Sequence, residues 1–351
     1  MKKIISLLLV LVMLFGIFTP VLAVEYGTEI PVLQSLPFTD VRSGQWYFSY
    51  VQAMHAEGVM TGTTATTFLP QGPFTRGQVL ATLFRIHHGR AHNASDPRNS
   101  GFSDVGTGAW YAPYATWARA NNIATGSALG ADVNAVRQEI ALFIHRYVAN
   151  LTDLGSGSTA NAQWNAFPDR GQIGSAHYGA LRWANNNGIV RGITADGVTR
   201  IVPLGTATRA EAATMLVRLM DLLPDGPSEA DIFEQRVLEL VNIERANHGV
   251  SPLAWHAGLG AISRAHSEDM VRRGFFAHTC PSGRTPRDRM RAAGIRYSFA
   301  AENIAAGQRT PESVVTAWMN SPGHRNNILH PSLRHLGVGF YNFHWTQKFI
   351  G

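Results

Sequence analysis

The chain has almost no cysteine: its 351 residues include one, Cys280. A disulfide needs two cysteines, so none can form within the chain, and its folding must depend on buried apolar surface. Charged residues are also few, at 15%, whereas hydrophobic residues make up 45%. This balance excludes a largely disordered chain and, with the length, favours two or more folded domains.

Long apolar runs are missing beyond the N-terminus. Lys2 and Lys3 precede an apolar stretch at 4–18, and Val21-Leu-Ala23 offers a small-residue cleavage site. The stretch is shorter than the roughly 20 residues that a membrane span needs. We therefore predict a cleaved signal peptide at 1–23, with a retained membrane anchor as the alternative, and no transmembrane helix after cleavage. Export without disulfides favours a Gram-positive-type bacterium.

Familiar catalytic patterns are absent as well. The chain contains no Gly-x-Ser-x-Gly, no His-Glu-x-x-His and no Cys/His nucleophile arrangement, which excludes the best-known hydrolase machinery. The net charge is +6 and the pI about 9.7. A basic exported protein suits an anionic partner. Because no nucleic-acid motif is present, we expect no nucleic-acid partner, and the simplest partner is an anionic cell-wall polymer.

A sequence unit repeats three times in the first 220 residues. We predict copies at 36–95, 100–155 and 165–222, each a helix, a turn, a short extended segment and a second helix. So regular a period predicts mostly α-helical units that bury their apolar faces against one another. Asp40 and Asp104 are expected to be helix N-caps or turn formers. The copies begin at equivalent phenylalanines, namely Phe38, Phe102 and Phe167.

The second helix of each copy has a distinctive start. Thr75 and Gln78, like Thr208 and Glu211, have the spacing of a capping box, in which two otherwise unpaired backbone N–H groups are satisfied. The middle copy has Val136 at the cap position and so lacks the hydroxyl.

Capping does not explain the arginine that follows the cap in every copy, at Arg76, Arg137 and Arg209. Arginine at a helix N-terminus opposes the helix dipole. One interpretation is an anion site, formed by helix N-terminal amides and the guanidinium group. The other is a solvated surface arginine with a buried stem.

A short linker, predicted at 223–229, leads to a second domain at 230–351. Apolar periodicity predicts helices beginning near Ile232, Leu259 and Pro311, and a hairpin formed by 336–341 and 345–349. Helices with a small antiparallel sheet make an α+β domain. Because the linker is short and rich in proline and glycine, we expect the two domains to unfold separately.

Three residues of the second domain could carry chemistry: His278, Glu302 and His324. Two imidazoles and a carboxylate in one cleft suit a zinc site or an acid/base pair. Two structural alternatives remain open. Glu302 could tie the sheet to a loop through backbone hydrogen bonds, and His324 could be structural through a bond to Glu302. We interpret His266 as a core or surface histidine, and Cys280 as a lone thiol or a soft metal ligand.

The repeats resemble the S-layer homology (SLH) family, whose triplets hold exported bacterial proteins on the cell wall. The resemblance rests on Phe38-Thr-Asp-Val41, Trp46-Tyr47, Phe68-Leu-Pro70 and Thr75-Arg-Gly-Gln78 with their counterparts. It implies a cell-surface protein held non-covalently by the anionic secondary wall polymer, a peptidoglycan-linked glycan. The implied polymer-binding residues are Thr75, Arg76, Arg137, Thr208, Arg209 and Glu211.

The second domain resembles the CAP superfamily, which includes cysteine-rich secretory proteins. The matching segments are Asn242-Ile-Glu-Arg245, Pro252-Leu-Ala-Trp255, Phe276-Ala-His278, Ala301-Glu-Asn303, Trp318-Met-Asn-Ser321-Pro-Gly-His324-Arg325 and Gly337-Val-Gly339. The resemblance implies a three-layer α+β sandwich that binds an extracellular lipid, glycan or peptide. It also implies a cleft of two histidines and two glutamates that holds zinc or another divalent cation in some members.

One member of that cleft is missing here. Ser321 stands near the place where the family offers its second glutamate. We therefore expect any metal held by His278, Glu302 and His324 to be weakly bound. The alternative function is a metal-assisted hydrolase of peptide or wall material that uses the same three residues.

Overall fold

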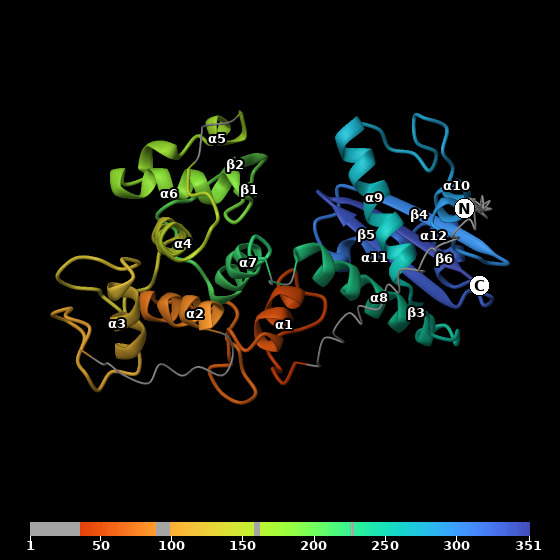
Figure 1. Ribbon diagram of the computed structural model, residues 1–351. Coiled ribbons are helices and arrows are strands. Elements are labelled where there is room, and N and C mark those ends of the chain that lie inside the picture. The colour runs from red at the N-terminus through yellow and green to blue at the C-terminus, as the bar shows by residue number, and fades with distance from the viewer. Residues whose placement is uncertain (1–35, 89–98, 158–161, 225, 227) are drawn as a thin grey trace, which may run out of the picture.

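The computed structural model describes residues 36–88, 99–157, 162–224, 226 and 228–351, which form a helical lobe and an α+β lobe (Figure 1). The predicted signal peptide at 1–23 lies outside the described residues. None of the helices in the described part combines the length and apolar character that crossing a membrane requires.

The helical lobe contains the three sequence copies. Copy one has α1 (Phe48–Ala56) and α2 (Arg76–His88), and copy two has α3 (Ala112–Ala120) and α4 (Arg137–Leu151). Copy three is more elaborate; its elements are α5 (Ala162–Ala166), η1 (Arg170–Gln172), α6 (Ser175–Asn186), the hairpin β1 (Ile193–Ala195) and β2 (Val198–Arg200), and α7 (Arg209–Met220). The predicted helix pair is present in each copy.

A closed ring of backbone hydrogen bonds joins the three copies. The N–H of Phe74 donates to the C=O of Ala207 over 3.1 Å, Ala207 donates to Ala135 over 3.1 Å, and Ala135 donates back to Phe74 over 2.8 Å. Each of these residues lies just before the second helix of its copy. Because each copy supplies one donor and one acceptor to the others, the ring satisfies backbone groups that would otherwise be buried unpaired.

An aspartate in each copy holds the turn that precedes this ring. Its carboxylate accepts two backbone N–H groups from residues 25 to 33 positions further along the chain. Each turn contains a residue with positive φ: Leu69, Gly130 or Val202. Asp40 and Asp104 are therefore turn formers, and Asp169 does the same in copy three. The alternative that Asp40 and Asp104 are helix N-caps is wrong.

The α+β lobe is built on a four-stranded sheet in the order β3-β5-β6-β4. Its strands are β3 (Ala254–Trp255), β4 (Ala300–Ala306), β5 (His335–Tyr341) and β6 (His344–Ile350), and its helices are α8 (Glu229–Asn247), α9 (Ala257–Arg273), α10 (Pro286–Ala292), α11 (Pro311–Met319) and α12 (Pro322–Ile328). The predicted hairpin is confirmed as β5–β6. The sheet is antiparallel except at its short edge strand, because β3 runs parallel to β5. The three-layer arrangement stays a prediction.

Two glycines let helix α9 lie directly against strand β5. A Cβ at Gly337 would come within 2.2 Å of the Gly260 amide nitrogen, and one at Gly339 within 2.0 Å of the Arg264 nitrogen. No side chain fits in that space. The Gly-x-Gly segment is thus a packing requirement that fixes α9 on the sheet.

The predicted linker ends in a buried contact between the lobes. Ser228 caps α8, and Glu229 accepts hydrogen bonds from Tyr50 at 2.6 Å, Arg191 at 2.8 Å and Arg218 at 3.0 Å. The rings of Tyr50 and Phe233 lie 5.5 Å apart beside this cluster. The first turn of α8 is therefore held by the helical lobe, which the sequence composition of the linker did not indicate.

Candidate functional site

The repeated arginines each reach into another copy. Arg76 donates to the carboxylate of Glu139 and, at 3.0 Å, to the Leu129 carbonyl. Arg137 donates to the Ile201 carbonyl at 3.2 Å. Contact between the copies, rather than a free surface, accounts for arginine at these helix starts.

The third arginine closes the cycle. Arg209 donates to the carbonyls of Phe68 and Thr61, both at 2.7 Å, in copy one. Arg137 also pairs with Glu211 at 3.5 Å, in the position that Glu139 holds for Arg76. Copy one has Gln78 at that place, so Arg209 binds carbonyl oxygens alone.

The amides at the helix starts are also occupied. The N–H groups of Arg76, Arg137 and Arg209 donate to carbonyls of another copy, over 3.0, 3.0 and 2.8 Å. A bound anion would have to displace these carbonyls. This occupancy opposes the part of the anion-site interpretation that uses the amides, and the polymer-binding role of the arginines stays a prediction. The interpretation of a solvated arginine is wrong for Arg137 and Arg209, which are buried.

The capping boxes are confirmed. Thr75 accepts from the Gln78 amide at 3.4 Å while Gln78 accepts from the Thr75 amide at 3.1 Å. Thr208 and Glu211 make the same pair of bonds, at 3.2 and 2.8 Å. Val136 has no side-chain acceptor, yet Glu139 still accepts from its amide. Thr75, Thr208 and Glu211 thus have structural roles that explain their positions.

Three residues from different copies meet around one cavity of about 340 Å³. Trp46, whose surface is 45% exposed, lines it together with Arg137 and Glu211. The exposed indole can stack on a sugar face. Arg137 adds positive charge, but its guanidinium nitrogens already donate to Ile201, Glu211 and Arg191. This is where the described structure brings sequence-predicted polymer-binding residues to an accessible hollow.

In the α+β lobe, His278 and Glu302 form a pair. The Nδ1 of His278 lies 2.8 Å from Oε1 of Glu302. Glu302 lies on β4 with only 5% of its side chain exposed, whereas half of the His278 side chain is exposed. The histidine ring is thus oriented by a buried carboxylate, with its other nitrogen available to a ligand.

Two cations that the sequence patterns did not predict pair with the same carboxylate. Lys348, from β6, forms an ion pair with Glu302 and is fully buried, and Arg289, from α10, donates at 3.2 Å. A signal was available for Lys348, because it lies in a strand whose flanking residues are all apolar or uncharged. A lysine buried in such a strand must find a carboxylate.

These contacts decide the charge of the site. Burial by itself would raise the pKa of Glu302, but the His278 hydrogen bond and the charges of Lys348 and Arg289 outweigh it and lower that pKa to about 2. Burial lowers the pKa of Lys348 to about 8 despite the nearby carboxylate. Near neutral pH, Glu302 is therefore an anion whose charge is already balanced.

The donor set does not fit a divalent cation on Glu302. The carboxylate already carries Lys348 and Arg289, and a metal ion there would face two fixed positive charges. Nowhere in the described ranges do three His, Cys, Asp or Glu side chains gather as a metal site. Zinc or another divalent cation at His278, Glu302 and His324 remains a prediction that this charge arrangement opposes.

His324 lies near the pair without bonding to Glu302. Its pKa is lowered by burial and by the charge of His278. Its backbone carbonyl accepts from Asn303 at 3.2 Å. The alternative in which His324 is structural through a bond to Glu302 is wrong, because the side chains that bind this carboxylate are those of His278, Arg289 and Lys348. Cys280 is buried beside Ser282, with the two side-chain atoms 3.1 Å apart.

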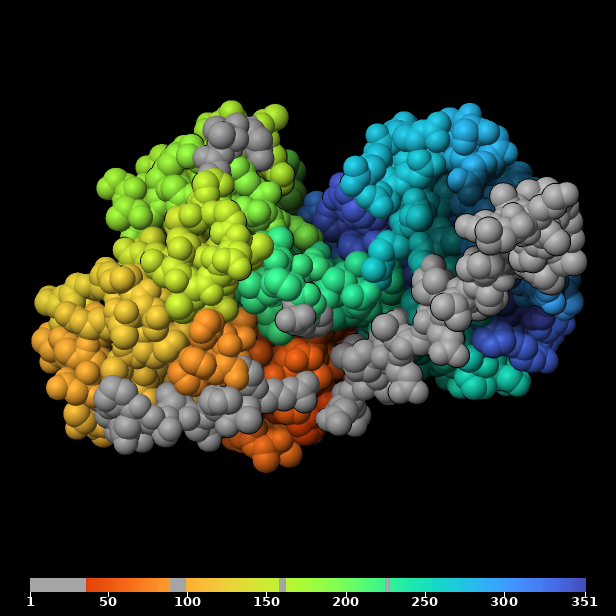
Figure 2. Space-filling model, in the orientation of Figure 1, coloured from red at the N-terminus to blue at the C-terminus, as the bar shows by residue number. Residues whose placement is uncertain are grey.

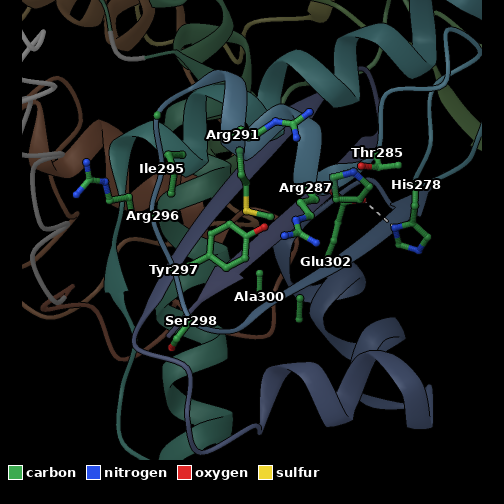
Figure 3. A pocket seen from close by; sticks show the side chains of 14 residues that line it. His278, Thr285, Arg287, Arg291, Ile295, Arg296, Tyr297, Ser298, Ala300 and Glu302 are labelled. Carbon is green, nitrogen blue, oxygen red and sulfur yellow. Dashed lines mark hydrogen bonds and ion pairs between the residues drawn. The ribbon is translucent and has the colours of Figure 1, made fainter.

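A cavity of about 1050 Å³ opens beside His278 and Glu302 (Figure 3). Its floor includes apolar side chains such as Met290 and Ile295, with the Tyr297 ring beside them. Its edge carries three exposed arginines, Arg287, Arg291 and Arg296. The cavity can therefore accept a ligand with an apolar part and an anionic group.

A buried histidine behind this site should make stability depend on pH. Burial lowers the pKa of His266 to about 4, and the charges of Arg289 and Lys348 add to that effect. Between pH 6.5 and 4 the unfolded chain binds more protons at this residue than the folded one. Stability should therefore fall as the pH drops through this window, by up to about 1.4 kcal/mol per pH unit.

Urea unfolding at several pH values checks this. His266→Gln, which can still donate to the Ala277 carbonyl that His266 contacts at 3.0 Å, should flatten the pH dependence. An unchanged slope in that variant would show that His266 does not cause the loss.

Family models match a segment in each of the two lobes. The family model described as S-layer homology domain matches residues 37–80. The model described as Cysteine-rich secretory protein family (CAP) matches residues 238–349.

Similar proteins come from Bacillus. The uncharacterised protein YkwD of Bacillus subtilis (strain 168) is 48% identical over 128 residues, which are 36% of this chain and 50% of that protein. The uncharacterised membrane protein YlbC of the same strain is 34% identical over 117 residues, 33% of this chain and 34% of its own length. The chain therefore spans half or less of these relatives.

Among solved structures, one similar protein is an extracellular protein containing a SCP domain from Bacillus anthracis str. Ames. It is 35% identical, with a TM-score of 0.35, and the match covers 37% of this chain and 44% of that one.

Proposed function

We propose that this chain, which carries an S-layer homology domain at 37–80 and a CAP domain at 238–349, is an exported cell-surface protein held on the wall by its three repeats. S-layer homology domains bind cell-wall polymers. The observation that carries the proposal is the cavity of Trp46, Arg137 and Glu211, where an exposed aromatic ring lies beside the positive charge of a buried arginine. Such a pair suits an anionic glycan, the secondary wall polymer.

The arginines serve this function in two ways. Arg137 lines the cavity and also joins copies two and three, and Arg209 joins copies three and one. Arg76 keeps 28% of its side chain exposed while it pairs with Glu139. Replacing these arginines would disturb the fold and the site together, so a surface residue makes the better probe of binding.

Trp46 is that probe. Its ring is exposed and contacts the ring of its neighbour Tyr47, with centroids 5.3 Å apart, so Trp46→Ala should leave the melting temperature nearly unchanged. We expect it to weaken co-sedimentation of the full chain with purified walls by about tenfold, as loss of an aromatic anchor often does. Trp110→Ala is the matched control: Trp110 is 53% exposed at the equivalent place in copy two and does not line this cavity. Equal binding by both variants and wild type would contradict the proposal.

For the CAP domain we propose binding rather than catalysis. The cavity beside His278 would take an extracellular ligand with an apolar part and an anionic group, such as a lipid, an acidic glycan or a peptide. Glu302 supports this view, because a carboxylate with a pKa of about 2 is a poor general base.

A hydrolase is the second candidate, and the oriented His278–Glu302 pair is the observation that favours it. The test is turnover of wall peptides by the full chain. Hydrolysis that His278→Ala abolishes, while ligand binding persists, would make the domain an enzyme.

A further inference from the structure

A second hollow adjoins the cavity of Trp46, and both lie where the two lobes meet. It measures about 600 Å³ and, like the first, is lined by Arg191, Gly192, Arg309 and Phe343. Arg191 and Gly192 belong to copy three, whereas Arg309 and Phe343 belong to the α+β lobe. Figure 2 shows the surface hollowed between the green residues of copy three and the blue residues of the C-terminal hairpin. We call the two cavities together the interlobe cleft.

Positive charge dominates this cleft. Its lining includes Arg137, Arg191, Arg218 and Arg309, against one carboxylate, Glu211. Arg191 and Arg218 share Glu229 behind the wall of the cleft. Arg309 is exposed and, within the described part of the chain, no carboxylate pairs with it. The guanidinium nitrogens of Arg137, Arg191 and Arg218 already donate to protein acceptors. These three side chains therefore supply positive charge that attracts anions, and Arg309 supplies the donors that can bind a carboxylate or phosphate.

Phe343 has an unusual backbone position for an aromatic residue. It follows Asn342 at the tip of the β5–β6 hairpin. The φ of Phe343 is 61° and that of Asn342 is 42°. Turns with two such residues favour glycine at the second place, so a phenylalanine there is strained. Its ring packs partly on the core beside Phe340 and partly lines the cleft.

Two guanidinium groups lie within about 6 Å of the centre of that ring. The Cζ of Arg191 is 5.8 Å from its centroid and that of Arg309 is 5.6 Å away. Cation–π contact attracts each arginine to the ring, but it also brings the positive charges of Arg191 and Arg309 close to each other. An anion bound between them would relieve the repulsion.

The loop that bears Arg309 is fixed to the hairpin. The Gly307 amide donates to the Phe343 carbonyl at 2.9 Å, and the Trp345 indole N–H donates to the Gln308 carbonyl at 2.9 Å. The α+β lobe thus presents a preformed cation and a preformed aromatic surface toward copy three. Preorganised groups bind with less loss of conformational freedom.

We propose that the interlobe cleft binds a segment of acidic polysaccharide and that the CAP domain completes this site with Arg309 and Phe343. The inference rests on the proposed wall-anchoring function and extends it to the second domain. Trp46 and Phe343 offer flat faces to sugar rings, and Arg309 binds their carboxylates or phosphates within the positive field of the other arginines. Two adjoining cavities accommodate more than one sugar, so the ligand is a chain rather than a lone anion.

Calorimetric titration of the full chain with oligoglucuronate tests this, with neutral oligoglucose as the uncharged comparison. Arg309→Ala should weaken oligoglucuronate binding at least fivefold. Phe343→Gly, which suits the turn and should preserve folding, should weaken it as well. Arg325→Ala removes an exposed arginine on α12 that does not line the cleft, and it should bind as wild type does.

The outcomes distinguish failure of the cleft assignment from failure of the proposed wall anchoring. If the chain binds walls and oligoglucuronate but neither cleft variant loses affinity, the cleft assignment is wrong while anchoring stands. Binding to walls without binding to oligoglucuronate overturns the acidic-glycan assignment. If the chain binds neither, both proposals fail. Equal affinity for a short DNA duplex, lost in the same variants, would make the cleft a general polyanion site and overturn the glycan assignment.

Discussion

Glu302→Gln should destabilise the chain by about 3–5 kcal/mol, the usual cost of breaking a buried ion pair from one side. The variant leaves Lys348, which is fully buried, and Arg289 without their carboxylate. Urea unfolding near neutral pH measures the loss. The penalty should shrink as the pH rises above 8, because Lys348, with a pKa of about 8, is then neutral in the wild type as well.

Two further variants make this result specific. Glu268→Gln removes an exposed partner of Arg272 and should cost less than about 1 kcal/mol. Adding Lys348→Met to Glu302→Gln should recover part of the stability, since it removes the unpaired buried ammonium. If Glu302→Gln costs no more than Glu268→Gln, Glu302 does not hold the cluster together.

Glu229→Gln should destabilise the chain by about 3 kcal/mol and separate the unfolding of the two lobes. The buried carboxylate accepts from Tyr50 and pairs with two arginines, so its loss leaves Arg191 and Arg218 without a counter-charge. Burial by itself would raise the pKa of Glu229, but the two arginines keep it below its ordinary value. We expect calorimetry to show one transition for the wild type and two for the variant.

Glu244→Gln, on the partly exposed side of the same helix, is the control and should keep the single transition. Two transitions in the wild type would contradict this account. They would instead support the expectation, drawn from the proline- and glycine-rich linker, that the domains unfold separately.

The sequence was informative wherever a pattern was local. The capping boxes, the helix pair in each copy and the β5–β6 hairpin all depend on residues within a few positions of one another. The roles of Asp40 and the repeated arginines depend on partners far along the chain. Arg209, for example, contacts Thr61 across 148 positions. Its repeated position in the sequence indicated a role, but only the packing of copy three against copy one shows that it binds the carbonyls of Phe68 and Thr61.

The candidate site was predicted in part. His278 and Glu302 were identified from sequence and do meet, but Lys348 and Arg289 were missed, and they change the chemistry. Both reach Glu302 from other elements, β6 and α10, so no local spacing relates them to it. The interlobe cleft could not be anticipated at all, because it needs the placement of one lobe against the other.

The central claim is that an acidic wall polymer anchors the full chain. The most direct measurement compares its binding to purified walls before and after chemical removal of the secondary polymer, at fixed ionic strength. The account predicts saturable binding to intact walls that is lost on stripped walls. The released polymer, added in solution, should compete with intact walls for the chain. Equal binding to intact and stripped walls would contradict it.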